Sequence, residues 1–153
     1  MLAELKVFLI AMSPILELRG SIPVALGVFH LPVWSSFLIS ILGNIVPVVF
    51  ILLLLESVSN FLSRHSHFFS QFFAWLFERT RRKHAKDFEY WKELALVFFV
   101  AIPFPFTGAW TGSLCAFVFG IPFKRALPLI ATGVVIAGIV VTLITLGIIQ
   151  ITI

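Results

Sequence analysis

Two ionisable residues, Glu17 and Arg19, lie inside a largely apolar stretch near the start of the chain. The flanking segments, 7–12 and 24–29, contain no charged residue. An ionisable group at the centre of a membrane segment costs at least about 2.5–3.5 kcal/mol, so such groups are rare there and usually functional. A glutamate can exchange a proton, and an arginine can hold an anionic group. We therefore take residues 13–23, SPILELRGSIP, as the candidate site.

This pair of charges has two interpretations. Glu17 and Arg19 can form an ion pair that only neutralises two costly charges. Alternatively, Arg19 attracts an anionic headgroup while Glu17 exchanges a proton, and competition for Arg19 couples the two events. Gly20 and Ser21 follow at the start of a second apolar arm, where the free amides of a half-helix point partial positive charge at an anion.

The composition places the chain in a membrane. Of its 153 residues 60% are apolar, and the mean hydropathy is +1.10, which excludes an ordinary soluble domain. We expect a multi-pass protein of the cytoplasmic (inner) cell membrane. The chain has no catalytic Ser/His/Asp set, Cys/His cluster, P-loop or dinucleotide fingerprint. No enzyme activity, cofactor, metal or nucleic-acid partner is therefore expected.

The first 30 residues predict a re-entrant helical hairpin (2–30). Its first arm, 2–12, is too short to cross a bilayer, which takes about 20 helical residues. We expect Pro14, Gly20 and Pro23 to break the helix near the midplane. Broken backbone is tolerated at membrane depth only inside protein or beside a wet cavity.

Residues 33–55 are long and apolar enough to span the membrane. Asn44 lies near the centre of this span, where we expect it to face Glu17. The segment 57–93 is aromatic and basic, which is typical of an amphipathic helix in the membrane interface. Seven of the eleven Lys/Arg residues fall within 56–93, and the positive-inside rule therefore makes this connection cytoplasmic.

The second half repeats this order. Segment 94–123 predicts a hairpin whose broken centre contains Pro103 and Pro105, and 126–149 predicts a second spanning helix. If 94–123 crossed completely, the basic pair at 124–125 would lie outside, against the positive-inside rule. The hairpin interpretation returns that pair to the cytoplasmic side.

The centre of the second hairpin carries polar and small residues. Gly108 and Gly112 have the spacing that lets two helices approach closely. Thr107 and Thr111, with exposed backbone amides, can instead line a binding cavity, in which Trp110 is either a wall or filler. Both interpretations stay open from the sequence.

The two halves, 1–56 and 94–153, therefore share one plan of a hairpin followed by a spanning helix. Each half contains one crossing, so the second half is inverted relative to the first. Inverted repeats with broken helices that meet at the midplane are typical of secondary transporters. This plan predicts that the two hairpin tips lie opposite each other. Two crossings cannot easily enclose a polar site, so we also expect a homodimer.

Two motifs, ELRGSIP (17–23) and PFPFTGAWTG (103–112), carry a resemblance to a known family. Together they resemble the small multi-drug export protein family, a distant relative of the DedA-like membrane proteins. The resemblance implies two re-entrant hairpins packed against membrane helices, and transport as the activity. DedA-like proteins are associated with anionic lipid carriers and the proton gradient, and have acidic residues in the first hairpin and arginines in the second. Glu17 fits that pattern, whereas Arg19 lies beside it and the second hairpin has no arginine.

The sequence thus predicts an all-α integral membrane protein with two inverted repeats, joined by a cytoplasmic amphipathic helix. We expect a secondary transporter or flippase for an amphipathic, anionic small molecule or lipid-phosphate headgroup, proton-coupled through Glu17. One alternative is export of lipophilic cations with Glu17 as the charge partner. Another is a membrane scaffold without transport. Membrane lipids are expected partners, and both termini are expected outside.

Overall fold

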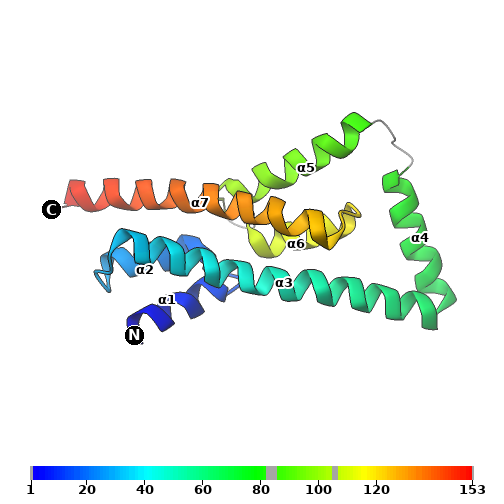
Figure 1. Cartoon of the computed structure of the whole chain (residues 1–153), viewed down its shortest axis with the longest axis horizontal. Coiled ribbons are helices and arrows are strands. Elements are labelled where there is room, and N and C mark those ends of the chain that lie inside the picture. The colour runs from blue at the N-terminus through cyan, green and yellow to red at the C-terminus, as the bar shows by residue number, and fades with distance from the viewer. Residues whose placement is uncertain (1, 82–85, 105–106, 153) are drawn as a thin grey trace.

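The computed structural model of the chain describes residues 2–81, 86–104 and 107–152 (Figure 1). Within these residues every regular element is an α-helix, which confirms the all-α prediction for the part described. The helices are α1 (Leu2–Met12), α2 (Glu17–Gly27), α3 (Val33–His65), α4 (His67–Arg81), α5 (Lys86–Ala101), α6 (Ala109–Val118) and α7 (Phe123–Thr152).

The break in the first pair of helices is shorter than the sequence predicts. It covers only the turn between α1 and α2, where the Ser13 hydroxyl donates to the Ile10 carbonyl at 2.8 Å and accepts from the Leu16 amide at 3.2 Å. The prediction that Gly20 and Pro23 also break the helix is wrong, because α2 runs through both. Burial of the apolar face of α2 outweighs the one backbone hydrogen bond that a proline removes.

The charged middle of the chain is divided among three helices. α3 continues ten residues past the predicted end of its apolar part at residue 55, and ends at His65 before the extended residue Ser66. α4 then leaves α3 at a steep angle, and α5 begins within the predicted connection 57–93 (Figure 1). Phe73 of α4 packs edge-on against Phe117 of α6, with ring centroids 6.2 Å apart. α4 therefore contacts α3, which precedes it, and also α6 through this pair of aromatic rings.

α3 and α7 run antiparallel through the centre of the molecule (Figure 1). α1 packs on α3 and α5 packs on α7, while α2 also contacts α7 and α6 also contacts α3. Two glycines permit close approaches of α1 to α3 and of α5 to α7. A Cβ on Gly43 would lie 2.7 Å from the Phe8 carbonyl of α1, and one on Gly133 would lie 2.7 Å from Val100 of α5. The core is apolar and includes Leu18, Ile22, Val48, Leu96, Val100, Ile130 and Val134.

α3 and α7 are the two described helices long and apolar enough to cross a bilayer. Only 39% and 33% of their most apolar stretches are buried inside the protein. Large side chains such as Phe50, Leu54 and Leu143 are exposed. A soluble core helix would hide such a surface, so these helices fit a protein whose outer surface faces lipid.

Candidate functional site

Arg19, in the first turn of α2, reaches the end of α5. Its guanidinium donates to the backbone carbonyl of Phe104, to the carbonyl of Ile102 at 3.4 Å and to the Thr107 hydroxyl at 3.1 Å. The last carbonyls of a helix lack intrahelical partners and form its partially negative end. Arg19 therefore caps the carboxyl end of α5 from another helix.

Thr107 completes this end of α5. Its hydroxyl lies 2.7 Å from the Ile102 carbonyl and 2.8 Å from the Phe104 carbonyl, while the Phe104 amide donates to it at 3.3 Å. The hydroxyl can donate to one carbonyl while it accepts from Arg19. The polar tip that the sequence predicted around Thr107 is therefore occupied by contacts within the protein.

Glu17, at the start of α2, lies against the start of α6. Its carboxylate accepts from the backbone amide of Trp110 at 3.3 Å and from that of Ala109, and the residue is only 6% exposed. The N-cap residue of α6 is Gly108, which has no side chain to bind these amides. Since the first amides of a helix form its partially positive end, Glu17 supplies the missing anionic cap.

Gly108 and Gly112 allow two different close approaches. A Cβ on Gly108 would overlap a carboxylate oxygen of Glu17 and lie 2.7 Å from the carboxylate carbon. One on Gly112 would lie 2.5 Å from the Val100 side chain of α5. Gly112 therefore serves helix packing, whereas Gly108 makes room for the carboxylate.

Glu17 and Arg19 each contact the second helix pair, and among the described residues they form no ion pair with each other. The backbone of Glu17 has φ 49°, in the left-handed region that residues other than glycine rarely adopt. Such a conformation persists where surrounding contacts hold it. The structure thus brings the predicted charges of one hairpin onto the backbone of the other.

Ser21 and Asn44 extend the site along α2 and α3. The hydroxyls of Ser21 and Ser40 are 2.7 Å apart and fully buried. Glu17 lies four residues before Ser21, and Asn44 four residues after Ser40, on two neighbouring helices joined by a short turn. This antiparallel register places Asn44 at the level of Glu17.

Asn44 is 1% exposed, and neither atom of its amide group has a hydrogen-bond partner. The indole nitrogen of Trp110 is also buried without a partner. Buried polar atoms in proteins are nearly always paired, so the amide group of Asn44 and the indole nitrogen of Trp110 are exceptions in this structure.

Beside Arg19 lies a groove of about 410 Å³ between α2 and α7. Arg19 is its one charged lining residue, at one end of a largely apolar wall. The groove is lined by Arg19, Pro23, Gly27, Pro103, Val141, Ile144, Thr145, Ile148 and Ile149. It is large enough for part of an amphipathic molecule.

The remaining predicted residues are more peripheral. Gly20 lies inside α2, where a Cβ would meet Leu16 at 2.8 Å, and Pro14 lies in the turn between α1 and α2. Thr111 is half-buried on α6. Pro105 lies outside the described residues. Among the described residues no three His, Cys, Asp or Glu side chains are grouped as metal ligands would be.

Sequence reasoning missed the partners of the two charges, because they are backbone groups. The carbonyls of Ile102 and Phe104 and the amide of Ala109 belong to apolar residues, whose types say nothing about these bonds. The feature of the sequence that does indicate these bonds is the predicted break in the helix. A helix interrupted at membrane depth leaves carbonyls and amides that need partners.

Comparison with known proteins identifies the family. Residues 17–140, more than half of the chain, match the model of the family described as Putative small multi-drug export protein. This match covers both charges of α2 and the whole broken segment that they cap. No curated protein and no solved structure matches the chain. The chain therefore belongs to this small multi-drug export family.

Proposed function

We propose that the protein is a secondary transporter or flippase. Its substrate would be an amphipathic, anionic small molecule or lipid-phosphate headgroup, and Glu17 would exchange a proton during transport. The family description supports export. The observation that carries the proposal is the placement of Arg19, which caps α5 and also lines the groove between α2 and α7.

The same side chain can therefore serve two partners in turn. An anion in the groove would compete with the Ile102 and Phe104 carbonyls for the guanidinium of Arg19. Release of α5 would loosen the contact between the two helix pairs. Protonation of Glu17 would weaken the cap on α6 and loosen the same contact from its other side. Substrate and proton would thus act on the same contact between the two helix pairs. Each can shift the protein between two conformational states only if it binds those states with different affinity.

We further propose that α1–α2 and α5–α6 are re-entrant hairpins of two inverted repeats. The contacts support this arrangement, since α1 and α5 pack on α3 and α7, while α2 and α6 pack on the spanning helix of the other half. Two pairs of residues 90 positions apart have matching roles. Gly43 and Gly133 each allow a neighbouring helix to approach closely, and His30 and Gly120 both have positive φ in the turn before a spanning helix.

In this proposal the protein crosses the cytoplasmic membrane more than once, with both termini outside and α4 at the cytoplasmic interface. Two spanning helices leave the groove beside Arg19 open on one side, which a second copy would close in a homodimer. Membrane lipids are the expected surroundings and a source of substrate. The proposal includes no enzymatic step, cofactor or nucleic acid.

Two other functions each have an observation in their favour. Export of lipophilic cations agrees with the words of the family description, and Glu17 would then be the charge partner. A membrane scaffold agrees with the internal contacts, since Glu17 and Arg19 bind backbone groups of the same chain. The three functions differ in which charge they require.

A binding panel separates them. Wild type, Glu17→Gln, Arg19→Ala and the control Arg64→Ala, which removes an exposed arginine of α3, would be tested in nanodiscs. Native mass spectrometry and thermal shift would follow anionic lipids, zwitterionic lipids and tetraphenylphosphonium. Our proposal expects anionic-lipid binding that Arg19→Ala alone abolishes. Cation binding that needs only Glu17 would favour drug export, and unchanged binding in every variant would favour the scaffold.

A transport assay tests the proton step. Proteoliposomes that hold wild type should move the bound lipid in response to a pH gradient. Glu17→Gln should remove that response while Arg64→Ala keeps it. Normal, gradient-dependent transport by Glu17→Gln would contradict the proposed role of Glu17.

A further inference from the structure

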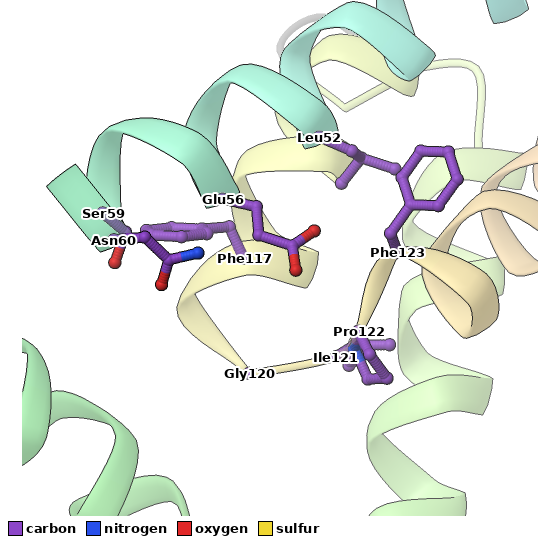
Figure 2. A pocket seen from close by; sticks show the side chains of 9 residues that line it. All are labelled: Leu52, Glu56, Ser59, Asn60, Phe117, Gly120, Ile121, Pro122 and Phe123. Carbon is purple, nitrogen blue, oxygen red and sulfur yellow. The ribbon is translucent and has the colours of Figure 1, made fainter.

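A second pocket lies away from the candidate site, between α3 and the turn that joins α6 to α7 (Figure 2). Its volume is about 210 Å³. It is lined by Leu52, Glu56, Ser59, Asn60, Phe117, Gly120, Ile121, Pro122 and Phe123. None of these residues belongs to the predicted site at Glu17 and Arg19.

Glu56 gives this pocket its charge. Among the described residues it is the one charged residue that lines the pocket. It is exposed, and its carboxylate has no hydrogen bond or ion pair with another described residue. Figure 2 shows the side chains of Glu56 and Asn60 leaving α3 toward the turn at Gly120. Arg125, on the other side of that turn, already pairs with Glu93 at 3.6 Å. An unneutralised carboxylate beside two side-chain acceptors favours a cation.

Two aromatic side chains narrow the class of cation. Phe117 and Phe123 line the pocket together with Glu56. Aromatic faces attract alkylammonium groups, which carry their charge on a weakly hydrated surface, and aromatic lining is how proteins hold choline-like ligands. A small metal ion would need more oxygen ligands than one carboxylate and two neutral side chains offer.

The volume of the pocket and its position along α3 indicate what kind of molecule carries the cation. Drug-sized molecules occupy about 300–1,000 Å³, so about 210 Å³ fits a headgroup and not a whole drug. Glu56 directly follows the apolar run of residues 51–55 on α3. Leu52 therefore lies toward the membrane, and Ser59 and Asn60 lie toward water. A headgroup in the pocket would leave its apolar tail in the membrane.

We propose that this pocket binds the ammonium group of an amphipathic molecule, with Glu56 as the counter-ion and Phe117 and Phe123 as its aromatic walls. The site is separate from Glu17 and Arg19 and does not depend on the transport that we propose for them. The same chemistry occurs in lipophilic ammonium compounds and in aminophospholipid headgroups. The experiment below distinguishes these two sources.

The test compares choline with 3,3-dimethyl-1-butanol, which has the same shape without the charge. Binding to the full chain in detergent would be followed by ligand-observed NMR. Wild type should bind choline about thirtyfold more tightly than the alcohol, because a desolvated cation–π contact contributes about 2 kcal/mol and 1.4 kcal/mol is a factor of ten. Glu56→Gln, which removes the counter-ion, and Phe117→Leu, which removes an aromatic wall, should each reduce this preference.

Glu78→Gln, which removes a carboxylate from α4, is the matched control and should keep the preference. Glu17→Gln should keep it as well, which separates failure of this site from failure of the proposed transport. The proposal is overturned if Glu56→Gln binds choline as wild type does, or if wild type does not distinguish choline from the alcohol.

The source is identified by repeating the measurement in nanodiscs. Phosphatidylglycerol alone has no ammonium group, whereas added phosphatidylethanolamine would compete if the pocket takes lipid headgroups. A weaker apparent affinity for choline in the mixed nanodiscs assigns the pocket to lipid. An unchanged affinity assigns it to soluble or drug-like ammonium compounds.

Discussion

Two glutamates of this protein, Glu17 and Glu56, differ in what surrounds the carboxylate. Glu17 is buried and accepts from the amides of Ala109 and Trp110. Glu56 is exposed at a pocket and has no described partner. The first carboxylate stabilises the fold and can act in function only by giving up those bonds. The second can bind a ligand without any cost to the fold.

The same contrast separates the two hairpins. α2 contributes both charged side chains, while the segment between α5 and α6 contributes backbone carbonyls and amides. A cation on the carboxyl end of one helix and an anion on the amino end of the next are each in their favourable position. The charges that look misplaced in the sequence therefore stabilise a break in another part of the chain.

The largest effect is expected from Gly108→Ala. The new methyl group would overlap the Glu17 carboxylate and separate α2 from α6. We expect a loss of about 3 kcal/mol or more in the free energy of unfolding, in the range of severe overpacking and loss of a charged cap. Unfolding in sodium dodecyl sulfate, followed by tryptophan fluorescence, measures it.

Gly147→Ala on α7 is the control, because a Cβ there has nothing within 4 Å. It should leave stability unchanged or slightly raised, since alanine favours helix more than glycine does. Equal stability of the two variants would show that the carboxylate does not lie against Gly108.

The second largest loss in the free energy of unfolding is expected from Arg19→Ala. It removes the donor to the Ile102 and Phe104 carbonyls and to Thr107. Hydrogen bonds from charged groups contribute about 1.5–3 kcal/mol, so we expect a loss near the middle of that range in the same unfolding assay. Arg19→Lys keeps the charge but cannot span several acceptors, and should recover only part of it. Full recovery by lysine would mean that charge alone matters there.

Glu17→Gln and Glu56→Gln make the same change at the two compared sites. Glutamine at position 17 can still accept from the Trp110 amide but brings no charge to the start of α6, which should cost about 1 kcal/mol. At position 56 the change should stay within about 0.5 kcal/mol, as for surface substitutions. Parallel thermal unfolding of both variants makes the comparison. A larger cost at position 56 would reveal a partner for that carboxylate in the assembled protein.

The sequence predicts well those features that depend on local pattern. The start of α3 after Pro32 and the position of α7 follow from apolar length and proline placement. The sequence pattern does not predict that α2 continues through Gly20 and Pro23, because buried Ile22 and Ala25 hold the helix in place by tertiary packing. Helix propensity depends only on the local sequence and does not include the stabilisation from tertiary packing.

The candidate site divides in the same way. Residue type and depth single out Glu17, Arg19 and Asn44, because polar groups are costly in an apolar span. Except for the Thr107 hydroxyl, the partners of Glu17 and Arg19 are backbone groups whose positions depend on where two distant helices end. The pocket at Glu56 is hidden for a related reason. Its aromatic lining comes from α6 and α7, more than fifty residues along the chain from Glu56.

Asn44→Leu should not destabilise the protein, and its effect on function is the most informative. Leucine has the same branching and number of side-chain heavy atoms, and no hydrogen bond is lost because the Asn44 amide has no partner. Stability should stay constant or rise by up to about 1 kcal/mol. If Glu17 is more than a helix cap, the same variant should lose substrate binding or transport in the nanodisc and proteoliposome assays. A variant that is stable and fully active would show that the unpaired amide of Asn44 has no part in binding or transport.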